Sequence, residues 1–161
     1  MKKLFCTYLI VGFFGVSAAG QDLGDEDKRK LIVSPGIAYQ GQVFGEVNLF
    51  YADVYLGHGY GFLGPRLGLE ANFRKDRFIY APKIGFELSG MLIALRTSAV
   101  GYVDDTKLDL RILPEAGFDF FFGSLTYGYN IPVLSYKSSE VKNHKISLSA
   151  RIHPAIWNEL K

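Results

Sequence analysis

The stretch KLDLRILPEAGFDF, residues 107–120, separates its apolar and polar side chains by alternation. The even-numbered residues are Leu108, Leu110, Ile112, Pro114, Ala116, Phe118 and Phe120, and the odd-numbered ones are Lys107, Asp109, Arg111, Leu113, Glu115, Gly117 and Asp119. Only Leu113 breaks the pattern. Because alternate residues of an extended chain point to opposite faces, this period of two predicts a β-strand with one apolar and one charged face.

The length of this strand indicates what surrounds it. At about 3.3 Å per residue it would reach roughly 45 Å, whereas strands of globular proteins are usually about 17 to 20 Å long. A tilted strand that crosses a membrane needs about 9 to 11 residues and uses the same alternation. We therefore expect a transmembrane strand with its apolar face outward and its charged face inward.

The same alternation returns in seven further segments, which are separated by turn residues such as Ser89-Gly90 and Gly123-Ser124. These segments are residues 31–40, 43–56, 64–74, 79–88, 91–103, 125–133 and 145–153. In residues 43–56 the apolar parity switches near Ala52, where we expect a β-bulge. Short connections imply antiparallel neighbours. The sequence therefore predicts an all-β fold, an eight-stranded antiparallel up-and-down transmembrane β-barrel.

The N-terminal residues 1–19 have the features of a cleaved secretory signal peptide, with Lys2 and Lys3 before a short apolar run and small residues at the end. The run is too short to serve as a membrane-spanning helix. Residues 20–30 follow without periodicity and are expected to form a flexible periplasmic leader. We assign residues 31–157 to the barrel and residues 158–161 to a C-terminal tail.

Composition argues against disulfide bonds in the exported chain and against attraction of nucleic acid. The only cysteine, Cys6, lies in the predicted signal peptide, so the exported chain has no disulfide bond. The chain has 18 basic and 16 acidic residues, and loss of Lys2 and Lys3 leaves the two counts equal. A net charge of zero offers no overall field that would attract nucleic acid.

Alternation alone leaves open which face of the barrel points inward. In a soluble lipocalin-like carrier the apolar face lines a ligand cavity, and in a membrane barrel it meets lipid. Small residues between the charged ones suit the narrow interior of eight strands, and charges of both signs can pair there. The predicted interior charge network, of which Arg111 and Glu115 are expected to be a coupled pair, consists of Glu46, Arg66, Glu70, Lys83, Glu87, Arg96, Asp109, Arg111, Glu115, Asp119 and Arg151.

Aromatic residues gather toward the ends of the predicted strands, as they do in the interfacial girdles of membrane barrels. The predicted girdle consists of Tyr39, Phe73, Tyr80, Phe120, Tyr127, Tyr129 and Trp157. Together with the small residues and the balanced charges of the polar face, these residues favour the membrane reading.

Two segments, YAPKIGFE (residues 80–87) and YGYNIP (residues 127–132), extend this interpretation. They resemble segments of an uncharacterised family of small outer-membrane barrels of Gram-negative bacteria, and the chain as a whole resembles the eight-stranded barrels typified by outer-membrane proteins A and X. The resemblance implies insertion into the cell outer membrane by the outer-membrane assembly machinery. Such barrels often end on an aromatic residue, a role that either Trp157 takes or no residue takes, with the tail free in the periplasm.

The histidines are the candidates for enzymatic and metal chemistry. Some small outer-membrane barrels modify lipid A with a histidine near a serine and a carboxylate, for which the candidates are His144 with Ser147 and His153 with Ser149. His58 has no second ligand at metal-binding spacing. We expect no catalytic residue, no metal and no cofactor.

The sequence thus predicts a non-enzymatic integral outer-membrane barrel whose interior is plugged by charges, present as a monomer in contact with membrane lipid and not with nucleic acid. Its role would be structural, or one of surface interaction through residues 135–143, the longest outward connection. A soluble periplasmic carrier of a hydrophobic ligand and a lipid A-modifying enzyme remain the alternatives.

Overall fold

The computed structural model describes residues 30–56, 60–74, 77–105 and 107–152. The predicted signal peptide, the predicted tail and all of the predicted leader except Lys30 lie outside the described residues. Lys30 itself begins the first strand. No helix that could span a membrane occurs in the described part of the chain.

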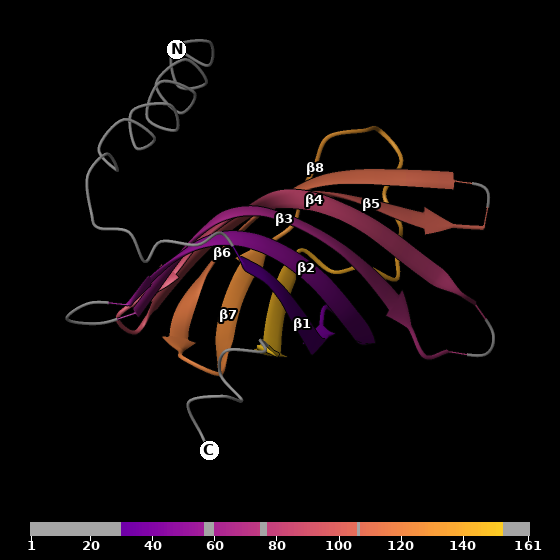
Figure 1. Cartoon of the computed structure of the whole chain (residues 1–161). Helices are drawn as coiled ribbons and strands as arrows, with labels where there is room; N and C mark the ends of the chain where they lie inside the picture. The colour runs from indigo at the N-terminus through magenta and orange to yellow at the C-terminus, as the bar shows by residue number, and fades with distance from the viewer. Residues whose placement is uncertain (1–29, 57–59, 75–76, 106, 153–161) are drawn as a thin grey trace, which may run out of the picture.

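The described residues form antiparallel strands joined by short connections (Figure 1). The strands are β1 (Lys30–Tyr39), β2 (Val43–Leu56), β3 (Tyr60–Asn72), β4 (Ile79–Gly90), β5 (Ile93–Asp104), β6 (Lys107–Phe120), β7 (Gly123–Tyr129), β8 (Ile131–Pro132) and β9 (His144–Ala150). β7 and β8 are two parts of one barrel strand, because both pair with β6 in one register and only Asn130 separates them. The nine segments therefore make eight barrel strands.

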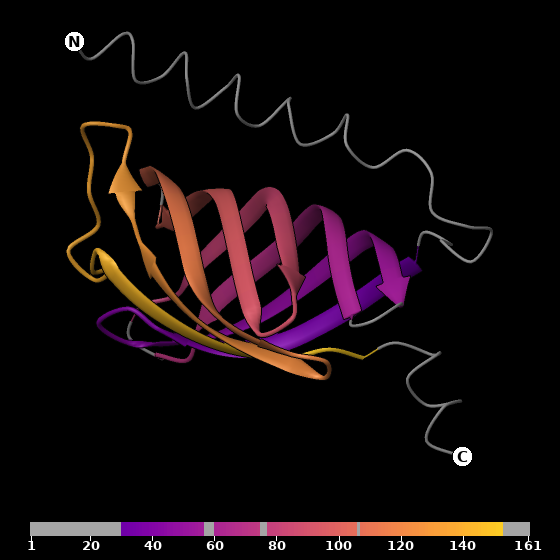
Figure 2. The ribbon, with the colours of Figure 1, turned by 90° about the vertical axis from the view of Figure 1, so that its left-hand side faces the viewer.

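Pairing between the first and last strands closes the sheet into a barrel. β1 pairs with β9 from Gly36↔Ser149 to Tyr39↔Ile146. Each remaining pair in the barrel joins two strands that follow one another in the sequence, with β7 and β8 taken as one strand. Residues 133–143 and the β1–β2 connection lie at one end of the barrel (Figure 2). Both ends of the described chain lie at the other end. The predicted eight-stranded antiparallel barrel is confirmed, and β6 has the predicted bounds.

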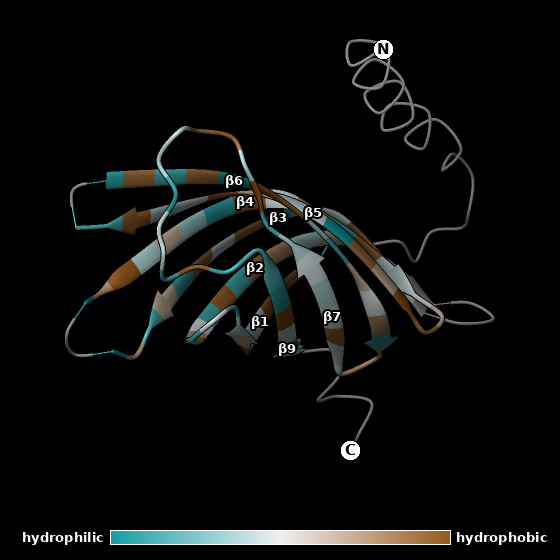
Figure 3. Ribbon diagram, turned by 180° about the vertical axis from the view of Figure 1, so that it is seen from behind, coloured by the Kyte–Doolittle hydropathy of each residue, from teal (hydrophilic) through white to brown (hydrophobic). Residues whose placement is uncertain are grey.

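Burial alternates along the strands, and it places the polar residues inside. On β6 the inward side chains of Arg111 and Glu115 are 1% and 5% exposed, whereas the outward Ile112 and Phe118 are 40% and 64% exposed. Figure 3 shows the same alternation of hydrophilic and hydrophobic residues along the ribbons. The barrel is therefore apolar on its outer surface and largely ionic within, the reverse of a soluble protein.

Apolar residues also occupy part of the interior. One cluster, formed by Ile32, Phe50, Ala52 and Phe62, is buried toward the end that carries the chain termini. The predicted bulge near Ala52 is wrong, because β2 keeps one register with β1 from Lys30↔Ala52 to Tyr39↔Val43. The apolar parity switches in the sequence because Phe50 and Ala52 point inward into this cluster.

Other strand boundaries also differ from the sequence prediction. β3 begins at Tyr60 instead of Gly64. The β4–β5 turn lies at Met91 and Leu92 instead of Ser89-Gly90, and both turn residues have positive φ. The β6–β7 turn lies at residues 121–122, two positions before the predicted turn. In both cases the predicted turn residues belong to strands, where an inward serine forms hydrogen bonds.

Candidate functional site

The interior charge network is the most densely built polar site of the described chain. Seven acidic and six basic side chains are buried among the described residues. All eleven residues of the predicted network are among them. The other two are Asp104, which was expected in a turn, and Lys145, which the alternation of residues 145–153 had placed on the polar face.

The middle of the network is an alternating set of two carboxylates and two ammonium groups. Lys83 Nζ lies 2.8 Å from both Glu46 Oε2 and Glu70 Oε1. Lys145 Nζ donates to Glu70 Oε1 and lies 3.5 Å from Glu46 Oε2. These four residues come from β2, β3, β4 and β9, so the ion pairs cross the barrel interior. Each charge faces two of opposite sign, which offsets part of the cost of removing it from water.

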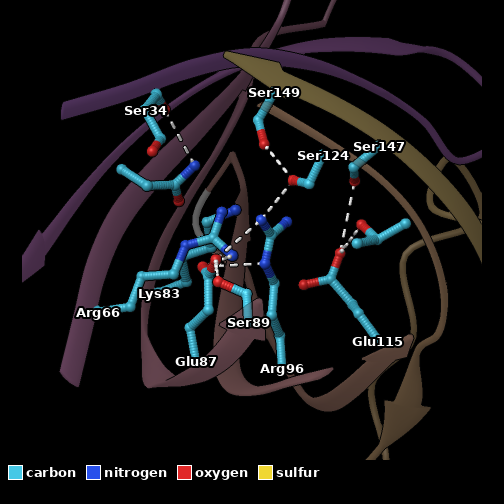
Figure 4. A network of polar contacts seen from close by, with 12 residues as sticks. Ser34, Arg66, Lys83, Glu87, Ser89, Arg96, Glu115, Ser124, Ser147 and Ser149 are labelled. Atoms are coloured by element: carbon cyan, nitrogen blue, oxygen red, sulfur yellow. Dashed lines mark hydrogen bonds and ion pairs between the residues drawn. The ribbon is translucent and has the colours of Figure 1, made fainter. Parts of the chain in front are cut away.

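A second part of the network surrounds Glu87 with three guanidinium groups, of which Figure 4 shows those of Arg66 and Arg96. Glu87 lies 3.3 Å from Arg66 Nη1, 2.9 Å from Arg96 Nε and 2.8 Å from Arg151 Nη2. Arg151 also pairs with Asp119 at 2.6 Å. Inward serines complete the set: Ser124 Oγ accepts from Arg96 at 2.5 Å and lies 2.9 Å from Ser149 Oγ. Small hydroxyl side chains fit between the long arginines in a narrow barrel.

Arg111 and Glu115, whose charges are expected to be coupled, each make their direct contacts with other residues. Arg111 pairs with Asp109 of its own strand, with Nη2 2.6 Å from Asp109 Oδ2. Glu115 instead accepts hydrogen bonds from Thr126 and Ser147, both at 3.4 Å. All of these side chains point inward, but the partners depend on height within the barrel, which alternation does not encode.

Residues 133–143, called the strap below, fold over one mouth of the barrel. Ser138 is 3% exposed; its amide donates to Asp109 Oδ2 and its hydroxyl to Asp104 Oδ2, both at 2.8 Å. Val141 is 4% exposed and belongs to an interior apolar cluster with Phe44 and Tyr102. Residues 135–143 of the strap were expected to be an outward surface loop, yet Ser138 and Val141 are buried against the barrel.

Asp104, the last residue of β5, fastens the strap to the barrel. It accepts hydrogen bonds from Ser138, from Tyr136 Oη at 3.2 Å, and from Arg77 at 2.5 and 2.8 Å. Burial disfavours the ionised form of Asp104, but the hydrogen bonds from Ser138 and Arg77 outweigh it and lower its pKa below the ordinary value. The same hydrogen bond raises the pKa of Arg77. The charged carboxylate is thus the form that fastens the strap.

Beneath the strap, three polar side chains close the mouth. Tyr102 Oη lies 2.9 Å from Gln40 Oε1 and 3.3 Å from Asn130 Oδ1, the two acceptors within reach of its one proton. Asn130 Nδ2 in turn donates to Gln40 Oε1 at 3.0 Å and to the Lys142 carbonyl at 3.2 Å. The sequence prediction missed this group, because an isolated tyrosine or amide on the inward parity gives no signal of its role.

The described residues of the predicted aromatic girdle lie on the outer surface. Its described members Tyr39, Phe73, Tyr80, Phe120, Tyr127 and Tyr129 are all exposed, and Trp157 lies outside the described residues. Charged side chains that are not buried lie in connections or toward strand ends in the described chain. They are Lys30, Asp53, Arg74, Arg77, Asp105, Lys107, Lys137, Glu140 and Lys142. Between these ends the outward face of the described strands is uncharged.

The candidate catalytic pair of His144 with Ser147 is not assembled. His144 is exposed, whereas Ser147 is buried, so the two point to opposite faces of β9. His153 and His58 lie outside the described residues. Among the residues that the structure describes, no group of three or more His, Cys, Asp or Glu side chains could hold a metal ion.

Comparison of the chain with protein-family models, curated proteins and solved structures finds no match.

Proposed function

We propose that the protein is an integral β-barrel of the bacterial outer membrane, exported through a cleaved signal peptide, with a structural or surface-interaction role and no enzymatic activity. The observation that carries the proposal is the distribution of side chains: an uncharged apolar outer face encloses an ionic interior. In water this arrangement would expose large side chains such as Leu49, Leu67, Ile84 and Phe118, each at least 44% exposed, to solvent. In a bilayer the same residues contact acyl chains.

The placement of charge supports this environment quantitatively. A Lys or Arg on the lipid-facing side of a barrel costs roughly 2 to 4 kcal/mol at the midplane and about 0 to 1 kcal/mol near the interfaces. Outward charges of the described strands are confined to the strand ends, where this cost is small, and the exposed aromatic residues Tyr39, Tyr80 and Tyr129 are of the kind found at interfaces. Such a belt suits a bilayer.

The two alternatives fit these observations less well. A carrier of a hydrophobic ligand needs an apolar cavity, whereas the positions that would line it here hold Glu46, Glu70, Lys83 and Lys145. A hydrolase of lipid A needs its histidine beside its nucleophile, and His144 points away from Ser147. The interior network instead serves as a plug that holds the strands together.

Alkaline carbonate extraction of envelope fractions tests the proposal. An integral barrel remains in the membrane pellet, because its outer face is held by lipid and not by charge. Release into the supernatant would exclude integral insertion and favour the soluble carrier. Lipid A mass spectra with and without expression test the enzymatic alternative, for which a changed acyl pattern is required.

A further inference from the structure

Four exposed side chains, from β7, β9 and the last residue of the strap, form an ordered polar group on the outer face, called the rim cluster below. Tyr127 Oη lies 2.5 Å from His144 Nδ1, and Asn143 Nδ2 donates to Tyr129 Oη at 3.3 Å. The His144 ring stands edge-on to Tyr129 with centroids 5.2 Å apart, and tilted to Tyr127 at 6.0 Å. These mutual hydrogen bonds hold the exposed side chains in one arrangement.

The strand register explains how these residues meet and where they lie. His144 is directly opposite Tyr129, and Tyr127 is opposite Ile146, so Tyr127 and His144 form a diagonal cross-strand pair. His144 is the first residue of β9, immediately after the strap. Ile146 and Ile131 beside the cluster are exposed and apolar. The rim cluster therefore marks the level at which the apolar outer face meets the polar strap.

The chemistry of the rim cluster is that of a hydrogen-bond donor. If Tyr127 donates to His144 Nδ1, the ring proton is on Nε2; if Nδ1 donates, the phenol proton is unused by this bond. Either arrangement leaves a donor on the outer face. Lys142, two residues before His144, is exposed and carries a positive charge, and the stem of its side chain lies beside Gly41 of the β1–β2 connection. The acidic residue of the strap, Glu140, pairs with Arg74 at 2.9 Å.

We propose that the rim cluster and Lys142 bind the phosphate-bearing headgroup of an anionic membrane lipid in the leaflet at the strap end. Phosphate oxygens accept from ammonium, imidazole and phenol donors, and basic side chains next to a bilayer attract anionic headgroups. Ile131 and Ile146 lie where the acyl chains of the same lipid run. A soluble anion would gain nothing from those apolar neighbours, which favours a lipid. This inference rests on the proposed membrane location.

Native mass spectrometry of the folded protein in neutral dodecylmaltoside micelles tests the inference. The probes are dioctanoyl phosphatidylglycerol, dioctanoyl phosphatidylcholine and inorganic phosphate. The phosphatidylglycerol should bind most tightly, and a loss of about fivefold in its affinity is expected for each of His144→Gln and Lys142→Gln. Lys137→Gln is the matched control, because it removes an exposed lysine of the same strap away from the rim cluster. The control should bind as the unaltered protein does.

Three results would overturn the inference. They are equal affinity for the two lipids, binding of inorganic phosphate as tight as that of phosphatidylglycerol, and an equal loss of phosphatidylglycerol affinity in Lys137→Gln. The last result would show that only the overall positive charge of the strap matters. His144 and Lys142 are exposed, so the variants should keep the thermal unfolding transition of the unaltered protein. Carbonate extraction measures membrane insertion independently of lipid affinity. A negative result in the lipid titration alone would therefore leave the proposed function intact.

Discussion

Lys145 of β9 donates a hydrogen bond to Glu70 of β3 across the barrel interior, although β1 and β2 separate the two strands in the sheet. Both side chains are fully buried, and Glu70 also pairs with Lys83. The strands are thus linked twice, by the backbone ladder around the wall and by ion pairs through the centre.

Removal of one partner of this pair should destabilise the barrel strongly. Lys145→Met leaves a buried carboxylate with one cation fewer, and such a loss costs about 3 to 5 kcal/mol. The free energy of unfolding in urea, measured in lipid or detergent, checks this value. Lys137→Met is the control, because an exposed lysine should change stability by no more than about 0.5 kcal/mol. Equal midpoints for the two variants would contradict an enclosed network.

Acid should release the strap from the mouth. The folded-state pKa of Asp104 lies below its ordinary value, so its contribution is complete above about pH 4 and is lost as the pH falls through the lower folded value. Pepsin cleavage within the strap should therefore increase at the acid end of the range from pH 2 to pH 5. Asp104→Asn should be cleaved throughout that range.

Asp105→Asn is the matched control for this experiment. Asp105 is the exposed neighbour of Asp104 in the β5–β6 turn, so its loss leaves the strap contacts intact. It should follow the pH profile of the unaltered protein. Identical profiles for Asp104→Asn and Asp105→Asn would show that the carboxylate of Asp104 does not hold the strap.

Gly117 of β6 should not tolerate a side chain. A Cβ atom there would lie 2.1 Å from the carbonyl oxygen of Leu125 on the adjacent β7, so backbone would have to move. Overpacking of this kind costs about 1 to 3 kcal/mol. Gly101→Ala is the comparison, because its Cβ would meet only the end of the Leu108 side chain at 3.2 Å. If both variants unfold at the same urea concentration, the close approach of β6 and β7 is not essential.

Much of this fold follows from alternation in the sequence. The period of two predicted β6 at residues 107–120 and the inward orientation of Arg66, Lys83 and Arg111, because a narrow barrel allows side chains only two directions. Turn positions were less certain: Met91 and Leu92 carry no turn signature, and Ser89 was needed inside as a hydrogen-bond partner of Glu87.

The partners within the site could not be predicted from alternation. Which charges meet depends on the stagger of strands that are far apart in sequence, as for Lys145 with Glu70. Polarity also misplaced residues 135–143: their serines, lysines and Glu140 suggested a loop in solvent, and Val141 is the only aliphatic residue among them. A single apolar residue in a polar segment is too weak a signal to fix its direction.

The most direct test of the central claim is the surroundings of the outward face in the middle of β6. The only cysteine of the chain is Cys6, so residues 20–161 can carry a single spin label at Ile112→Cys or at Ser139→Cys in the strap. In liposomes the Ile112 label should collide with oxygen and be shielded from a water-soluble nickel complex, while the Ser139 label should show the opposite. Equal nickel accessibility at the two positions would contradict a barrel whose apolar face meets lipid.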